Sequence, residues 1–111
     1  MDILVQAEGV TLTETIKNAV DEKIGRVEQY APRAVRARVN LRKVSAHPSP
    51  RQFIVRVLVE IPGADLSAEE SSADVISALD VVEGKIERRL RKRKTERLAQ
   101  RVDGPRRKSK S

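Results

Sequence analysis

Residues 72–101 constrain the fold of this chain most, because their apolar residues return at the period of an α-helix. The spacings are four, three, four and four positions, which places these side chains on one stripe of a helix. The stripe residues are Val75, Leu79, Val82, Ile86 and Leu90. The pattern predicts a long helix that packs on a core by its first half, and we expect Gly104 and Pro105 to end it.

The second half of this predicted helix is strongly basic. Residues 85–101 hold nine Lys or Arg and only two acids, Glu87 and Glu96. A helix dipole needs only one or two cations near its C-terminal end, so this density favours a polyanionic partner. The competing interpretation is a solvated cationic helix end without a partner.

Charge is segregated along the rest of the chain as well. The net charge is −3 over residues 1–32, +7 over 33–56, −7 over 57–84 and +10 over 85–111, which gives +7 and a pI of about 10.2 for the 111 residues. This balance is typical of a nucleic-acid-binding domain. With no cysteine, disulfides and thiolate chemistry are excluded, which fits a reducing compartment. The sequence shows neither a signal peptide nor an apolar run long enough to cross a membrane.

The remaining patterns predict four strands and one further helix. Alternating apolar residues indicate strands at 1–8, 34–44, 52–61 and, more weakly, 64–70. A helix begins after Thr11 or Thr13 and ends at Pro32, and we interpret its Gly25 as a close-packing position. The order β-α-β-β-β-α predicts an α+β fold, a four-stranded sheet with two helices packed on one face. The first two strands should be parallel and the others antiparallel.

The strand at 34–44 carries an arginine row. Val35, Ala37, Val39 and Leu41 are expected to face the core, while Arg36, Arg38 and Arg42 face the other way. A solvated sheet face and an RNA contact are equally good explanations of this row. In the next strand, Ile54 and Leu58 share the outer face with Arg56, and the sequence does not indicate what covers them.

Catalysis finds little support in the sequence. The one histidine, His47, lies in a proline-containing loop at 45–51, and Asp74 and Asp80 do not share a helical face. There is no cluster for zinc and no Gly-rich phosphate loop. We therefore predict a protein that is not an enzyme and has no cofactor, metal or small-molecule substrate. We expect Tyr30 and Phe53 to be core residues, which disfavours base stacking and favours structured RNA read by shape and backbone.

Two segments of the last helix resemble the ribosome hibernation-promoting factor family, also called ribosome-associated inhibitors or sigma-factor modulation proteins. They are residues 73–80 (ADVISALD) and 85–94 (KIERRLRKRK). The positions that match the family pattern in the second segment are Lys85, Arg88, Leu90, Arg91, Lys92 and Lys94. Residues 21–24 match more loosely, and the resemblance spans roughly residues 3–98. Ile76, Gly84 and Arg93 depart from the pattern, but none of these changes removes a cation.

The resemblance implies a fold related to double-stranded-RNA-binding domains and a cytoplasmic protein. It also implies binding to rRNA of the small ribosomal subunit, in the decoding channel, where the protein inhibits translation by blocking mRNA and tRNA. The chain is expected to be a short form, or the N-terminal part of a long form, with a ribosome-binding domain at 1–101 and a disordered basic tail at 102–111. The RNA-binding residues expected are Lys23, Arg36, Arg38, Arg42, Lys85, Arg88, Arg89, Arg91, Lys92 and Lys94. The alternatives are a protein-interaction modulator of transcription and a general structured-RNA-binding module.

Overall fold

The computed structural model describes residues 1–44 and 52–110, with side chains described for residues 1–44 and 52–94. The elements in chain order are β1 (Asp2–Glu8), α1 (Glu14–Gly25), α2 (Val27–Tyr30), β2 (Arg36–Lys43), β3 (Phe53–Glu60), β4 (Leu66–Ser72) and α3 (Val75–Lys110). The predicted loop at 45–51, with His47, lies outside the described residues.

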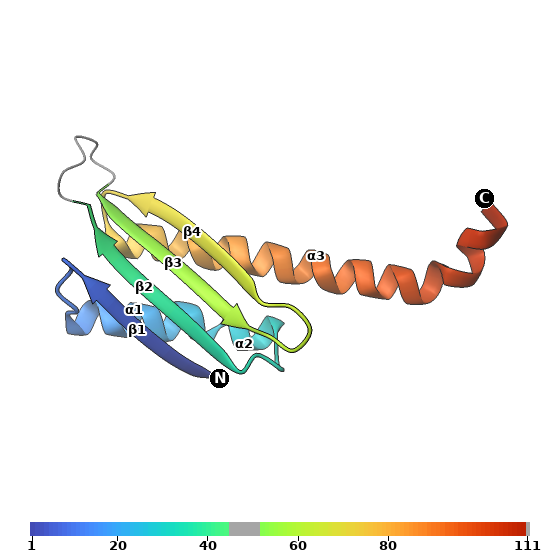
Figure 1. The fold of residues 1–111 in the computed structure, drawn as a ribbon, viewed down its shortest axis with the longest axis horizontal. Coiled ribbons are helices and arrows are strands. Elements are labelled where there is room, and N and C mark those ends of the chain that lie inside the picture. Colours follow the sequence, from blue (N-terminus) through green and yellow to red (C-terminus); the bar gives the residue numbers. More distant parts are fainter. Residues whose placement is uncertain (45–51, 111) are drawn as a thin grey trace.

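The four strands form one sheet in the order β1-β2-β3-β4. β1 pairs with β2 in parallel, and the β2–β3 and β3–β4 pairs are antiparallel, as predicted. The helices lie behind the sheet on one face, and α3 crosses behind β4 and β3 and continues beyond the sheet (Figure 1). The predicted α+β architecture is therefore confirmed.

The core lies between the sheet and the helices. All five stripe residues of α3 are buried, and they pack with inner-face residues of β2 and β3 such as Val39 and Val57. Val35 was expected to face this core but is 54% exposed. It precedes β2, which begins only at Arg36, so the alternation of the strand does not yet apply to it.

The first predicted helix is divided into α1 and α2 at Arg26. Thr13, not Thr11, caps α1, because its hydroxyl accepts a hydrogen bond of 3.2 Å from the Ile16 N–H. A Cβ at Gly25 would meet nothing within 4 Å, so the close-packing explanation of this glycine is wrong. Its position at the end of α1 fits its low helix propensity instead.

The last helix begins and ends later than the sequence predicts. Residues 71 and 72 belong to β4, and the carboxylate of Asp74 then accepts hydrogen bonds from the N–H groups of Ile76 and Ser77 at the start of α3. At the other end the backbone stays helical to Lys110, through Gly104 and Pro105 and through the residues expected to form a disordered tail. A proline inside a helix removes one hydrogen bond and bends the axis without having to end it, and α3 bends near its C-terminal end (Figure 1).

Candidate nucleic-acid interface

Three cations on one side of α3 are used to cover the edge of the sheet. Lys85 donates to the carbonyl oxygen of Glu69 at 2.9 Å, Arg89 donates to that of Ser67, and Arg93 donates to that of Ala64 at 2.9 Å. These donors are four residues apart and share one helix face, which lies along β4. Lys85 also forms an ion pair of 2.9 Å with Glu70. Because β4 is an edge strand, this row satisfies carbonyl groups that no neighbouring strand can reach.

A second side of α3 is tied to the first two helices. Lys23 of α1 forms an ion pair with Asp80, and its side chain is only 16% exposed. Arg26 contacts Glu83 at 3.4 Å, and Glu83 is the one charged residue that is buried in the described part of the chain. These contacts neutralise part of the positive charge of α1 and position α3 against it.

Arg91 lies on this same side of α3, further along the helix. Its guanidinium is 3.1 Å from the carboxylate of Glu87 and 5.4 Å from the centroid of the Tyr30 ring in α2. The Arg91 side chain is still 66% exposed. Tyr30 and Phe53 are both half-buried and pack at the margin of the core, and Lys43 lies 5.7 Å from the centroid of the Phe53 ring. Both aromatics expected in the core therefore lie at its edge, each beside a cation.

Three further cations of α3, called the outer cations below, are of a different kind. Arg88, Lys92 and Lys94 are exposed, and among the described residues none of them has an ion pair or hydrogen bond with another side chain or carbonyl. Arg88 and Lys92 are one helical turn apart on the side away from the sheet, which is the outer side of α3, whereas Lys94 lies on the side that faces α2. Of the ten residues expected to bind RNA, only these three have neither an ion pair nor a hydrogen bond within the described part of the protein.

The arginine row of β2 lies on the open face of the sheet, as predicted, but it is not a uniformly positive surface. Arg38 contacts Glu60 at 2.8 Å, Arg36 contacts the same carboxylate at 3.5 Å, and Arg42 contacts Glu8 at 3.5 Å. The hydrogen bond from Arg38, with the charges of both arginines, lowers the pKa of Glu60. Each arginine of the row therefore has a carboxylate partner on a neighbouring strand.

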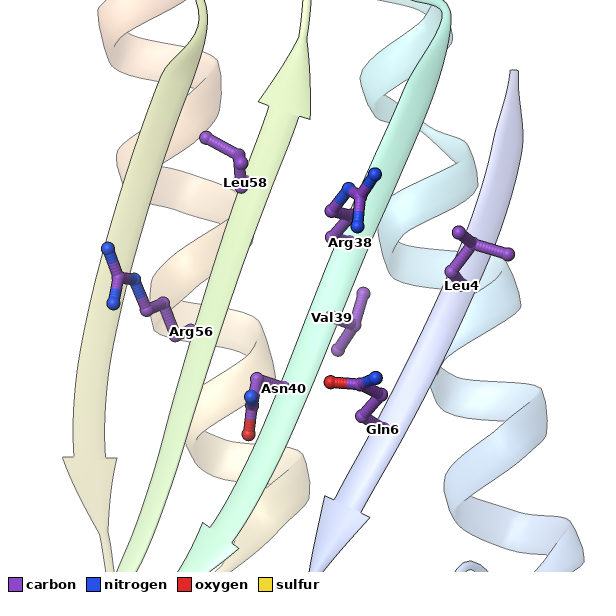
Figure 2. Close-up of a pocket in the computed structure, with 7 residues that line it drawn as sticks. All are labelled: Leu4, Gln6, Arg38, Val39, Asn40, Arg56 and Leu58. Carbon is purple, nitrogen blue, oxygen red and sulfur yellow. The ribbon is translucent and has the colours of Figure 1, made fainter.

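A shallow hollow of about 230 Å³ lies in the middle of this open face. Figure 2 shows Leu4 and Leu58 on either side of Arg38, with Gln6, Asn40 and Arg56 further along the strands. Leu58 and Ile54 are both half-buried, although no helix covers this face (Figure 1). The side-chain oxygen of Asn40 is buried and accepts no hydrogen bond.

The expected RNA-binding residues therefore do not form one continuous surface. The β2 arginines face away from the helices, whereas the outer cations of α3 lie on the helix side of the sheet (Figure 1). Two cations missed by the sequence prediction, Arg33 and Arg93, lie with Arg91 and Lys94 around a groove between α2 and α3. No local signal separates Arg33 and Arg93 from the other basic residues, because the groove is formed by segments distant in sequence.

The described residues hold no group of three or more His, Asp or Glu placed to bind a metal ion. In the part of the chain that the structure describes, no helix combines the length and the apolar character required of a membrane span.

Residues 3–98 match the family model described as Sigma 54 modulation protein / S30EA ribosomal protein. A ribosome hibernation promotion factor from Deinococcus radiodurans is 34% identical over 100 residues, which are 90% of this chain and 52% of that protein. One from Staphylococcus aureus is 32% identical over 94 residues, covering 82% of this chain and 47% of that protein. The chain spans about half the length of these relatives.

Solved structures share the fold at lower identity. A ribosomal subunit interface protein from Coxiella burnetii superposes with a TM-score of 0.73 at 21% identity, over 86% of this chain and 99% of that one. The N-terminal domain of Protein Y from Thermus thermophilus gives a TM-score of 0.68 at 22% identity, over 83% and 98% of the two chains. With a family model matched over most of its length, and with relatives above 30% identity, the chain belongs to the Sigma 54 modulation protein / S30EA ribosomal protein family.

Proposed function

We propose that this protein binds the ribosome and suppresses translation, by occupying the decoding channel of the small subunit and excluding mRNA and tRNA. The observation that carries the proposal is the set of exposed cations of α3 that have no partner among the described residues, Arg88, Lys92 and Lys94. Family membership and relatives named ribosome hibernation promotion factors indicate the ribosome as the source of the polyanion. A cytoplasmic location follows from this proposal.

The outer cations suit the backbone of folded RNA. Each Lys or Arg that neutralises a phosphate releases condensed counterions, which stabilises the complex without reading sequence. Arg88 and Lys92 lie one turn apart on the side of α3 away from the sheet, so both can contact one phosphate backbone.

The other expected contacts require an exchange of partners. To bind a phosphate, Lys23 must share or leave the carboxylate of Asp80. Lys85 must do the same with Glu70, and Arg91 with Glu87. Arg89 must likewise leave the carbonyl of Ser67, and Arg36, Arg38 and Arg42 must leave Glu60 and Glu8. We propose Arg88, Lys92 and Lys94 as the main phosphate contacts and these seven residues as secondary ones.

Cosedimentation with separated ribosomal subunits at moderate salt tests this function, together with translation in a cell-free system. We expect the protein to be recovered with the small subunit. We also expect translation to decrease as the fraction of subunits with bound protein increases. Protein found only in the free fraction, with translation unaffected, would contradict the proposal.

A protein-interaction role is the second candidate, because the family description also names sigma 54 modulation. In that case the outer side of α3 would bind an acidic protein surface. If the protein fails to bind ribosomes but binds a transcription factor of this class, this alternative is favoured. If the protein binds folded RNAs and ribosomes with equal affinity, a general RNA-binding module is favoured.

A further inference from the structure

A groove of about 900 Å³ opens where α2, the segment after it, the β3–β4 turn and α3 meet. Its lining comes from three regions of the chain, residues 29–33, 61–62 and 90–94. These regions meet at the end of the sheet where α3 leaves the body of the domain (Figure 1). The groove lies on a different side of α3 from Arg88 and Lys92, and Lys94 belongs to the groove side.

The charged residues that line the groove are all basic. Its lining includes Arg33, Arg91, Arg93 and Lys94 but no acidic residue. Arg93 is held in place by the Ala64 carbonyl, and Arg91 by Glu87 and the Tyr30 ring. Arg33 and Lys94 are exposed at the rim and have no partner among the described residues. The rim can therefore bind anions without breaking an existing contact.

The floor of the groove is apolar. Tyr30 and Ile61 are half-buried there, and Leu90 closes the floor as the last stripe residue of α3. The Arg91 guanidinium beside the tyrosine ring adds a planar cation of the kind on which bases stack. An apolar floor with an aromatic edge, under a rim of free cations, matches a ligand that has a flat apolar body and a negatively charged end.

We propose that this groove binds one nucleotide of an unpaired RNA strand, with its base on the Tyr30–Ile61–Leu90 floor and its phosphates on Arg33 and Lys94. This inference rests on the proposed ribosomal function and extends it, because it adds a single-stranded contact to the phosphate contacts of α3. A duplex could not reach the floor, since its bases are already stacked and paired.

Tyr30 is the only tyrosine in the sequence, so replacing it by 3-fluorotyrosine gives one ¹⁹F resonance that reports on the groove. Titration with hexauridylate should shift this resonance to saturation, at an affinity that falls as salt is raised. In the variant Arg33→Gln/Lys94→Gln the affinity should fall about tenfold, and the salt slope should flatten by about 1.4, as expected for two phosphates of a single strand. The matched control, Lys17→Gln/Arg56→Gln, removes two exposed charges outside the groove and should keep the affinity within about threefold of the starting protein.

Several outcomes would overturn the inference. One is a resonance that does not move while labelled hexauridylate binds, or an absence of binding altogether. Another is an equal shift by an RNA duplex, by uridine monophosphate or by hexaglutamate, which would assign the groove to paired RNA, a free nucleotide or an acidic peptide. Equal losses in the two double variants would also overturn it. Because this titration contains no ribosomes, its failure is separate from a failure of cosedimentation.

Discussion

The guanidinium of Arg93 donates a hydrogen bond of 2.9 Å to the main-chain carbonyl of Ala64, which ties the basic half of α3 to the segment leading into β4. Arg89 and Lys85 make the equivalent contacts one and two turns earlier, with Ser67 and Glu69. Cations that the sequence groups together thus have two roles. Those facing β4 stabilise the fold, and those on the outer side remain available.

The first prediction follows from this division. The variant Lys85→Ala/Arg89→Ala/Arg93→Ala should unfold several degrees below the unmodified protein, because each lost hydrogen bond contributes about 0.5–1.5 kcal/mol. It should also self-associate, since the exposed edge of β4 can pair with another strand. Thermal melting and light scattering check both effects. The control Arg88→Ala/Lys92→Ala/Lys94→Ala removes the same charge, and equal melting temperatures in the two variants would contradict the edge role.

The second prediction concerns the outer cations. In Arg88→Ala/Lys92→Ala/Lys94→Ala, the slope of log affinity for the small subunit against log salt should flatten by roughly 2–3 units if all three bind phosphates. Exposed substitutions of this kind cost under about 0.5 kcal/mol each, so the fold should be kept. Binding measured at a series of salt concentrations gives the slope. An unchanged slope in a folded variant would remove these residues from the interface.

The third prediction addresses the open face of the sheet. Arg36→Ala/Arg38→Ala/Arg42→Ala should remain folded and bind the small subunit more weakly, if these arginines exchange Glu60 and Glu8 for phosphates. The loss of Arg38 and Arg36 should also raise the pKa of Glu60 toward its ordinary value, because the hydrogen bond and charges that lower it are gone. Carboxyl NMR titration measures the pKa. A variant with the changed pKa but unchanged ribosome affinity would show that the row is only solvated.

The fourth prediction tests the start of α3. The Asp74 carboxylate accepts hydrogen bonds from the Ser77 hydroxyl at 2.9 Å and from two backbone N–H groups, and these contacts lower its pKa below the ordinary value of an aspartate. Asp74→Ala should therefore cost about 1 kcal/mol of stability near neutral pH. Asp74→Asn keeps a capping oxygen and should cost less.

The effect of pH on this cap has a definite sign. Because the folded pKa of Asp74 is lowered, its charged form contributes stability that is complete above the unfolded pKa and is lost as pH falls through the folded pKa. The difference in melting temperature between the unmodified protein and Asp74→Asn should therefore shrink at acid pH. A difference that stays constant from neutral to strongly acid pH would show that the charge of Asp74 is not involved.

Periodicity in the sequence was enough to predict the strands and the faces of the helices, and the connections between elements predicted which strands are parallel and which antiparallel. The stripe from Val75 to Leu90 and the alternation of β2 report burial, which is a local property repeated at the period of each element. The same reasoning failed at the ends of elements. Val35 is exposed just before β2, and α3 continues through Gly104 and Pro105, because the residue type at such a position is compatible with more than one backbone conformation.

The sequence by itself determined that this is a basic α+β domain with its positive charge in two segments, 33–56 and 85–111. Only the tertiary structure decided which of those charges are free. Lys85 has its partner 15 residues away and Lys23 has its partner 57 residues away, so their neutralisation depends on how α3 packs against β4 and α1. Charge pairs form wherever packing brings opposite charges within a few ångströms, and that distance is set by the assembled layers and not by the order of residues in the chain.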